Sequence, residues 1–204
     1  MDTVSAVVLC GGKGSRLGGV EKPLRELLGR PLLDRVLTAL RPQAQELVIV
    51  ANARHEAYAS RGTRLVDDGT YAGRGPLAGI AAGLAAAANE QVVCAPGDAP
   101  LLPPDLVAAL QAARRHAGAE VAVVHDGGGW QPLCCLLSKR LLPDLQQYLD
   151  GGGDAPRDWL RRHRVAECDY SGWPRWGWSV NTLQEWSLVE TELRAKDGMG
   201  DGTA

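Results

Sequence analysis

Residues 4–23 read VSAVVLCGGKGSRLGGVEKP, and this stretch decides which fold the chain can adopt. Its first six residues are almost all apolar, which predicts a buried β-strand. Five glycines follow, and they let the backbone turn tightly and approach a ligand without a Cβ in the way. Backbone N–H groups in such a turn bind anions, and Lys13, Arg16 and Lys22 add positive charge. The stretch therefore predicts a strand that leads into a loop for the phosphates of a nucleotide.

Two common phosphate-binding motifs do not match this loop. A P-loop needs a lysine and then a hydroxyl residue after its last glycine, whereas Val20 and Glu21 follow Gly19. The dinucleotide fingerprint needs a third glycine where this chain has Leu17. An ordinary glycine-rich turn with solvated basic side chains is the other explanation. We favour the nucleotide loop because so many glycines and basic residues exceed what a turn requires.

The composition fits one domain of ordinary size. The chain has 204 residues, of which 45% are hydrophobic, enough for a substantial core. Its 24 acidic and 22 basic residues give a net charge of −2, which argues against nonspecific binding of nucleic acid. The apolar runs are shorter than a membrane span and the N-terminus lacks a signal pattern, so we expect a cytoplasmic protein without a membrane partner. Five cysteines without C-x-x-C spacing are expected to be free thiols.

Apolar runs alternate with helical patterns along most of the chain. Continuous apolar strands separated by helices are typical of a mainly parallel sheet covered on both faces. We therefore expect an α/β fold of three layers. The expected strands are 4–9, 46–51, 64–67, 91–96, 120–124 and 132–137, and the expected helices are 31–40, 77–88, 103–117, one that ends at 148 and one at 158–163.

The segment 94–100, CAPGDAP, places Asp98 just beyond the end of an expected central strand. Open α/β sheets bind ligands at this end of their strands. A carboxylate beside a triphosphate repels it unless a cation lies between them, so Asp98 predicts bound Mg²⁺. The alternative is a turn aspartate that hydrogen-bonds its own backbone. Its place next to the glycine loop favours the metal site.

The glycine loop resembles that of the nucleotidyltransferases that move an NMP onto a phosphate. Their signature has a leucine, a Gly-Gly or Ala-Gly pair, an Arg-Met/Leu-Gly triplet and a Lys-Pro or Lys-Gly pair, all found in order within residues 9–23. The Gly11-Gly12 pair is most similar to the molybdenum cofactor guanylyltransferases of that superfamily, and the resemblance extends from about residue 4 to about residue 190. Cys10 departs from the usual alanine, a change of similar size. The resemblance implies a Rossmann-like nucleotidyltransferase fold.

The resemblance also implies roles for particular residues. It implies nucleotide binding by Leu9, Cys10, Gly11, Gly12, Gly14, Lys22, Asn52, Asp68, Gly75, Pro76, Leu77, Gly79 and Asp98. It implies catalysis by Arg16, Lys22 and Asp98, with Lys22 neutralising charge on the α-phosphate. The Asp68 carboxylate suits guanine because it can accept from the ring N1–H and the exocyclic amine together. From the residues alone, segment 75–80 is equally well explained as a plain helix start.

The segment 179–182, SVNT, resembles the family's Val-Asn-Thr motif before the final helix. The resemblance implies that the Asn181 side chain joins Asp98 as a second oxygen ligand of the metal. The residues alone favour a helix N-cap at Asn181 or Thr182, and the two roles do not exclude each other.

The side that binds the acceptor is harder to assign. The run 157–164, RDWLRRHR, could receive a phosphate, although a solvated helix face is the commoner explanation. Trp173, Trp176 and Trp178 could stack on a flat heterocycle or simply cover the core. We expect one domain over residues 1–190, with nucleotide bound by about 1–100 and acceptor by about 101–190, and a flexible tail over 191–204.

The implied reaction is transfer of GMP from GTP to the terminal phosphate of molybdopterin, with Mg²⁺ as cofactor and pyrophosphate as the second product. Segment 131–133, QPL, resembles the family strand beside the pterin. The implied protein partners are proteins of cofactor biosynthesis or the molybdoenzymes that receive the product. Two alternatives remain at this point. One is an enzyme of the same fold that uses CTP or a sugar phosphate, and the other is a GTP-binding regulatory protein without catalysis.

Overall fold

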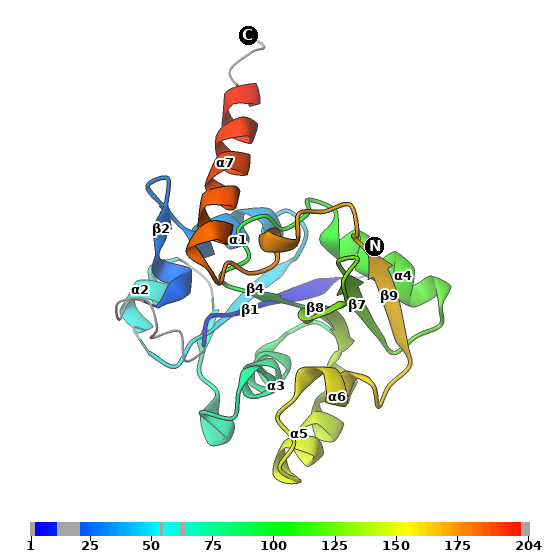
Figure 1. The fold of residues 1–204 in the computed structure, drawn as a ribbon. Coiled ribbons are helices and arrows are strands. Elements are labelled where there is room, and N and C mark those ends of the chain that lie inside the picture. The colour runs from blue at the N-terminus through cyan, green and yellow to red at the C-terminus, as the bar shows by residue number, and fades with distance from the viewer. Residues whose placement is uncertain (1–2, 12–20, 54, 62–63, 201–204) are drawn as a thin grey trace.

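A seven-stranded sheet runs through the middle of the molecule in the order β5-β4-β1-β6-β8-β7-β9 (Figure 1). The strands are β1 (Val4–Leu9), β4 (Glu46–Val50), β5 (Arg64–Val66), β6 (Gln91–Pro96), β7 (Val121–His125), β8 (Trp130–Ser138) and β9 (Val165–Asp169). β8 runs antiparallel to β6 and β7, and the other neighbouring pairs are parallel. The computed structural model describes residues 3–11, 21–53, 55–61 and 64–200. The sheet confirms the expected α/β fold with mainly parallel strands.

Helices cover both faces of this sheet, which gives three layers (Figure 1). On one face lie α1 (Leu32–Leu40) and α4 (Leu106–His116), and on the other α3 (Pro76–Ala86), α5 (Leu142–Asp150) and α6 (Pro156–Leu160). Side chains alternate across β1, so that Val8 packs in the core under α1 and α4 while Val7 and Leu9 pack in the core under α3. Because both faces of the strand are buried, its sequence is apolar along nearly its whole length.

Two glycines bring α3 close to β1. A Cβ at Gly83 would overlap the side chain of Val7, and a Cβ at Gly79 would lie 3.1 Å from Leu9 Cδ2. At these points α3 contributes no side chain and the β1 side chains pack directly against its backbone. Protein interiors are packed too densely for larger residues to fit here without a shift. The first turn of α3 is thereby held beside the end of β1, where the glycine loop begins.

Several short elements connect the main ones. They are η1 (Lys22–Leu24), the hairpin of β2 (Glu26–Leu27) and β3 (Arg30–Pro31), α2 (His55–Ala59), η2 (Gly69–Tyr71), η3 (Lys139–Leu141) and η4 (Arg175–Gly177). The hairpin and α2, together with the edge strand β9 of the main sheet, were not predicted from the sequence. The hairpin lies between the glycine loop and α1, and its Leu27 belongs to a third, smaller core cluster.

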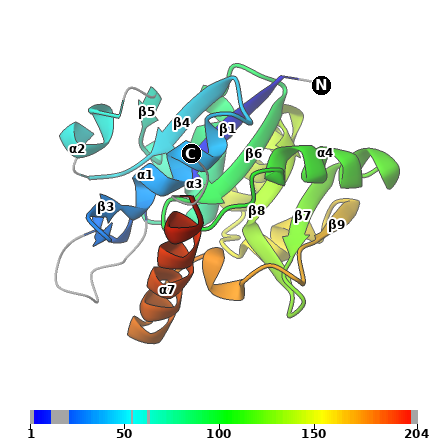
Figure 2. The same cartoon turned by 90° about the horizontal axis from the view of Figure 1, so that it is seen from above.

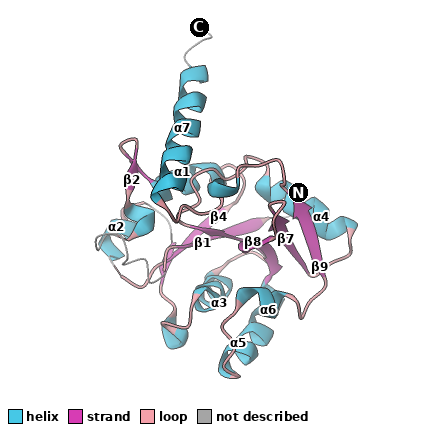
Figure 3. Ribbon diagram, in the orientation of Figure 1, coloured by secondary structure: helices cyan, strands magenta, loops and turns pink. Residues whose placement is uncertain are grey.

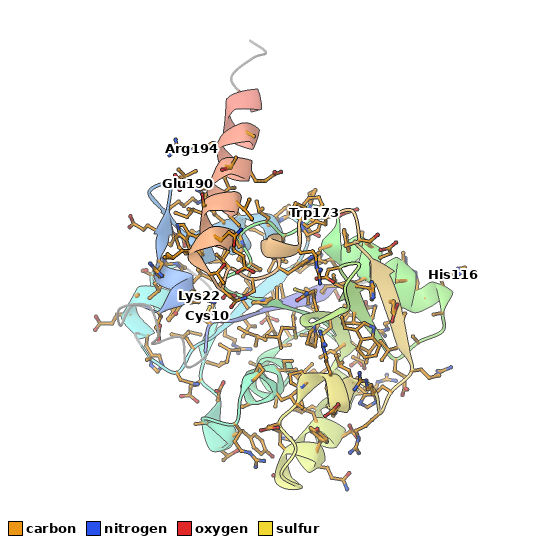
Figure 4. The ribbon with its side chains drawn as sticks, viewed as in Figure 1. Cys10, Lys22, His116, Trp173, Glu190 and Arg194 are labelled. Carbon is orange, nitrogen blue, oxygen red and sulfur yellow. The ribbon has the colours of Figure 1, made fainter. Side chains whose placement is uncertain are left out.

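The last helix, α7 (Leu183–Gly200), projects away from the body of the molecule (Figure 3). Val189 and Leu193 on this helix pack in the small cluster with Leu27. The structure differs here from the expected flexible tail, because the helix continues to Gly200. Arg194 Nη2 lies 2.7 Å from Glu190 Oε1 one turn earlier (Figure 4), and such pairs support an exposed helix. Within the described residues, no helix is long and apolar enough to cross a membrane, α7 included.

All five cysteines are buried and none forms a disulfide, as the sequence predicts. Cys94 on β6 and Cys135 on β8 are direct partners across the antiparallel ladder. Cys168 lies on the edge strand β9, and Cys10 follows β1. The thiols are therefore distributed from the middle of the sheet to its edge.

Candidate active site

Four parallel strands end at the same edge of the sheet and bring the predicted site residues together. Backbone hydrogen bonds continue past the ends of these strands, as where Cys10 N donates to Val50 O at 2.8 Å. The residues that follow β1, β4, β5 and β6 are Gly11, Asn52, Asp68 and Asp98, respectively. The carboxyl ends of parallel strands are where α/β sheets bind ligands.

Asn52 and Asp68 form a closed pair at the ends of β4 and β5. Asn52 Nδ2 donates to Asp68 Oδ2 at 2.6 Å, and the Asp68 backbone N–H donates to Asn52 Oδ1 at 2.9 Å. A Cβ at Gly11 would lie 3.4 Å from Asn52 Nδ2, and a Cβ at Gly79 would lie 3.4 Å from Asp68 Oδ1. Four residues predicted to bind the nucleotide therefore lie side by side.

Asp68 as a whole is 8% exposed, and burial raises the pKa of its carboxyl above the ordinary range. The Asn52 amide opposes this rise in pKa by donating to the carboxylate, while the nearby Asp67 adds to it. A cleft of about 590 Å³ opens beside Asn52 and is lined further by Ala53 and the first residues of α2. Asp68 itself lines a second cleft, of about 410 Å³, together with η2 and part of α3. A buried carboxylate that borders a cleft can accept hydrogen bonds from a ligand where the low dielectric strengthens them.

Lys22, Asp98 and Asn181 come from distant parts of the chain and meet at one point. Lys22 Nζ lies 3.0 Å from Asp98 Oδ2 and donates to Asn181 Oδ1 at 2.8 Å. Ser179 Oγ also donates to Asp98 Oδ2, at 3.1 Å. In Figure 4, Lys22 lies next to Cys10 at the foot of α7, so it is near the end of β1. The ammonium draws two oxygen atoms from separate elements toward one centre.

The first turn of α7 shows which residue caps the helix. Thr182 Oγ1 accepts from Glu185 N at 3.1 Å, while Glu185 Oε2 accepts from Thr182 N at 2.9 Å. This reciprocal capping box satisfies two backbone donors that have no partner within the helix. Thr182 is therefore the N-cap, and the Asn181 side-chain oxygen is directed to Lys22 instead.

The oxygen donors around Lys22 fit a magnesium ion. Magnesium is usually held by one or two carboxylates together with substrate phosphates and water. Asp98 offers a carboxylate and Asn181 an amide oxygen at the same point. Over the part of the chain that the structure describes, no group of three or more histidine, cysteine and acidic side chains could hold a metal alone. The donor set fits a cation that arrives together with a phosphorylated ligand.

Cys10 lies beside this centre as a packing residue. Its Sγ would be 2.6 Å from a Cβ at Gly97, so the thiol fills the space that this glycine leaves. Burial raises the pKa of the Cys10 thiol, and the Asp98 and Glu21 carboxylates raise it further. A thiol that stays protonated is a poor nucleophile, which agrees with a residue that only takes the place of alanine.

A family model described as the MobA-like NTP transferase domain matches residues 6–167. The chain belongs to this family. A molybdenum cofactor guanylyltransferase of Ectopseudomonas mendocina is 44% identical over 158 residues, which are 78% of this chain and 77% of the relative. Another from Cupriavidus pinatubonensis is 40% identical over 189 residues, which are 90% of this chain and 94% of the relative. The resemblance read from the glycine loop is thus confirmed.

A solved structure shows the fold of the NTP transferase family independently. The crystal structure of molybdopterin-guanine dinucleotide biosynthesis protein A from Archaeoglobus fulgidus superposes with a TM-score of 0.76 at 24% sequence identity. The match covers 94% of this chain and 99% of that chain. At this level of identity the likeness establishes the three-layer fold.

The structure describes only part of the glycine loop. Leu9, Cys10 and Gly11 lie at the end of β1. Gly12, Gly14 and Arg16, to which the sequence analysis also assigned nucleotide binding or catalysis, lie outside the described residues, as does Lys13. Their roles stay predictions.

Segment 75–79 forms the beginning of α3. Gly75 precedes the helix with φ of +76°, a conformation that favours glycine, and Pro76 occupies its first turn. Leu77 is fully buried in the core below the sheet, so its side chain packs there. Gly79 is the member of this segment that approaches Asp68. The helix start and the predicted nucleotide contact are compatible, because one turn serves both.

The basic run 157–164 is largely paired with acidic neighbours. Arg161 Nη1 lies 3.2 Å from Asp158 Oδ1, and Arg162 Nη2 lies 3.3 Å from Asp144 Oδ1. These ion pairs fit a solvated helix face better than a site for a phosphate, which was the commoner of the two explanations.

The tryptophans near η4 cover the core. Trp178 is buried and packs edge-on against Tyr170, with 5.5 Å between the ring centroids. Trp173 is partly buried, and its indole N–H donates to Leu101 O at 2.6 Å. The side chain of Trp176 lies outside what the structure describes. Of the two explanations for this cluster, packing fits both described side chains.

Asp126 and Arg175 form a charged pair that the sequence analysis missed. Asp126 follows β7 and is 3% exposed, and Arg175 Nε lies 3.3 Å from its Oδ2. A signal for Asp126 was present, because an aspartate followed by three glycines comes after an expected strand with one residue between them. Arg175 had no comparable signal, since its position depends on a contact between distant segments.

Proposed function

We propose that this chain transfers GMP from GTP to the terminal phosphate of molybdopterin and releases pyrophosphate. The relatives at 44% and 40% identity are named molybdenum cofactor guanylyltransferases. The observation that carries the proposal is the meeting of Lys22, Asp98 and Asn181 at the carboxyl edge of the sheet. At this point the Lys22 ammonium group and two side-chain oxygen donors lie beside the loop where a triphosphate would bind.

Guanine would bind at the Asn52–Asp68 pair. Guanine presents its N1–H and its exocyclic amine side by side, and a carboxylate can accept from both. Cytosine has no ring N–H beside its amine, so the same carboxylate favours GTP over CTP. Gly75, Pro76, Leu77 and Gly79 would border the base with their backbone. The triphosphate would lie along Leu9, Cys10, Gly11, Gly12 and Gly14, with Arg16 adding charge.

Asp98, joined by Asn181, would hold Mg²⁺ when the nucleotide binds. The bound ion would neutralise charge on the phosphates. Lys22 would then exchange these oxygen atoms for the α-phosphate and neutralise the charge that develops there. The same three side chains would in this way serve both the empty and the loaded site.

The acceptor phosphate needs little activation. An oxygen of this phosphate would form a bond to the α-phosphorus as the bond from that phosphorus to pyrophosphate breaks. Because the attacking group is already an anion, no general base is required. Catalysis would rest on positioning and on stabilisation of charge.

The proposed reaction divides one domain into two functional halves. Residues up to about 100 would carry the nucleotide contacts, and residues from about 101 to 190 would border the acceptor. We place the reaction in the cytoplasm, where GTP is available. Proteins of cofactor biosynthesis, or the molybdoenzymes that receive the product, would be its partners.

Pyrophosphate release by the purified protein tests the proposal. GTP, CTP, ATP and UTP are each supplied with Mg²⁺ and either molybdopterin or a sugar 1-phosphate. Release with GTP and molybdopterin alone is the expected result. Release with CTP or with a sugar phosphate would keep the reaction type and reassign the substrates. Tight GTP binding without release would instead support a regulatory protein.

A further inference from the structure

The loop between β7 and β8 holds a second charged cluster at the carboxyl edge of the sheet. Asp126 Oδ1 accepts from the backbone N–H groups of Gly128 at 2.8 Å and Gly129 at 2.9 Å. Asp126 Oδ2 accepts from Gln131 Nε2 at 2.7 Å and from Arg175 Nε at 3.3 Å. Burial opposes the charge of Asp126, but these donors outweigh it and hold the pKa of the carboxyl below its ordinary range. Asp126 is therefore a buried anion that fixes both the loop and Arg175.

The glycines of this loop make room for the Arg175 side chain. A Cβ at Gly128 would overlap Nη2 and Cζ of Arg175, so the guanidinium lies directly on bare backbone. Gly127 has φ of +85° and Gly129 has φ of +155°, so the loop conformation also favours glycine at these two positions. Consecutive glycines lose much conformational entropy on folding. In this loop, the absence of side chains lets the Arg175 guanidinium pack directly against the backbone.

Arg175 is anchored and yet open to solvent. Its side chain is 65% exposed, whereas that of Asp126 is 3% exposed. Its Nε is directed to Asp126, and most of the side chain is open to solvent, so a ligand can approach the guanidinium. A guanidinium binds anions such as phosphate through paired N–H groups, and one that is already positioned loses less freedom on binding.

The cluster lies on the opposite side of Asp98 from the guanine contacts. In the sheet, β4 and β5 lie on one side of β6, and β8 and β7 lie on the other (Figure 2). The segment that carries Arg175 continues to Ser179, which donates to Asp98. A nucleotide that extends from Asp68 to Asp98 would therefore leave the side of Arg175 for the acceptor.

We propose that Arg175, positioned by Asp126 and the Gly127–Gly129 loop, binds an anionic group of the phosphorylated acceptor. The inference rests on the proposed function, since it assigns a contact to the acceptor that this function requires. Asp126 is the positioning residue, because its donors already occupy both carboxylate oxygens. The basic run on and after α6 has a different role, because its arginines at 161 and 162 are paired with their own neighbours.

The test compares two arginines of equal exposure. Arg175→Ala is expected to raise the KM for molybdopterin about tenfold or more, as loss of a charged hydrogen bond does. The KM for GTP should stay the same, and the melting temperature should fall only slightly, because Asp126 keeps three of its four donors. Arg175→Lys should recover part of the loss in KM. Arg161→Ala is the matched control, because Arg161 is also 65% exposed and ion-paired, but with Asp158. It should leave both KM values unchanged.

Gly128→Ala moves the guanidinium without removing its charge. The added Cβ would take the place of the far end of a flexible side chain, so the protein should still fold. The KM for molybdopterin should rise as in Arg175→Ala. The double variant should be no worse than Arg175→Ala alone, because both changes act on one contact.

Equilibrium dialysis of molybdopterin against the protein without nucleotide measures acceptor binding directly. This measurement separates the inference from the proposed function. If the wild-type protein transfers no GMP, the proposed function fails, and weaker molybdopterin binding by Arg175→Ala still supports the contact. If that variant binds molybdopterin as the wild type does, or keeps its KM within twofold, the contact is refuted. An equal rise in KM for Arg161→Ala would also refute it, since general surface charge would then explain both.

Discussion

Two buried carboxylates, Asp68 and Asp126, stand at the same edge of the sheet but have opposite electrostatic settings. Burial raises the pKa of Asp68, and among the described residues the side-chain donor that reaches it is the Asn52 amide. Asp126 is buried as well, yet two backbone N–H groups, Gln131 and Arg175 hold its pKa low. The Asp68 carboxylate can still accept hydrogen bonds from a ligand, whereas the Asp126 carboxylate already accepts hydrogen bonds from the protein at both oxygens.

This difference distinguishes a binding group from a scaffold group. A carboxylate that is buried with few donors costs stability, and the cost is recovered when a ligand brings donors of its own. A carboxylate with a full set of donors stabilises the loop around it and aims another side chain. We expect the proposed nucleotide site to bind its ligand through buried groups such as Asp68. We expect the proposed acceptor site to bind through exposed side chains that are held in place by groups such as Asp126.

The largest effect is expected at the border between the two halves. Lys22→Met and Asp98→Asn should each lower kcat about 10²- to 10³-fold, because each removes charge from the place where it is needed in the transition state. Pyrophosphate release measures this loss, and circular dichroism should show an unchanged fold. Arg194→Ala on the exposed part of α7 is the control and should keep full activity. Near-normal turnover in either site variant would contradict the assignment.

Asp126→Ala should destabilise the protein by about 3 kcal/mol, since it leaves several donors of a buried carboxylate without a partner. Because the folded pKa of Asp126 is lowered, its contribution is present at neutral pH and is lost as the pH falls from the ordinary carboxyl range through that lowered value. Urea unfolding of wild type and variant, at neutral pH and in acid, measures the difference. A difference that does not shrink in acid would show that Asp126 is no charged scaffold.

Asp68→Asn should weaken GTP binding without destabilising the protein. The KM for GTP should rise about tenfold, because the variant loses a charged acceptor for guanine. The stability of the variant at neutral pH should not fall. A carboxyl whose folded pKa is raised makes the folded protein less stable as the pH rises from the ordinary carboxyl range through the raised value, and an amide has no such effect. Steady-state kinetics and urea unfolding test the two parts. A large loss of stability at neutral pH would place Asp68 with Asp126 as a scaffold residue.

The smallest effect separates two neighbours at the start of α7. Thr182→Ala should cost about 1 kcal/mol of stability, as loss of an N-cap does, and leave the Mg²⁺ requirement unchanged. Asn181→Ala should raise the Mg²⁺ concentration needed for half-maximal activity and keep the stability. Thermal unfolding and a Mg²⁺ titration of both variants decide this. The same change in both variants would mean that capping is the only function of the motif.

The sequence predicted the first half of the fold well because short, local patterns specify it. A buried parallel strand is a continuous apolar run, and the glycine loop follows it directly, so that residues 4–11 and 91–98 could be placed without a structure. Asn52 and Asp68 were assigned from the family resemblance, and the hydrogen bonds between them appear only in the structure, where two parallel strands end at one edge.

The second half of the fold was less predictable because contacts between distant segments define it. β9 is an edge strand whose residues alternate between buried and exposed, so it lacks the continuous apolar run of the central strands. Arg175 gains its position from Asp126, which is 49 residues away in the chain. The helical end of α7 was missed because its polar and glycine-containing sequence gave no apolar stripe to read.

The buried cysteines give this protein a built-in reporter of how its sheet comes apart. A thiol reagent needs access to a thiolate, so in native buffer labelling must wait for the chain around each thiol to open. Cys168 on the edge strand β9 would then be labelled before Cys94 on the central strand β6 if the sheet opens from its acceptor edge. Labelling of both at one rate would mean that the sheet opens as a whole. Mass spectrometry of partly labelled protein can read this order without any engineered probe.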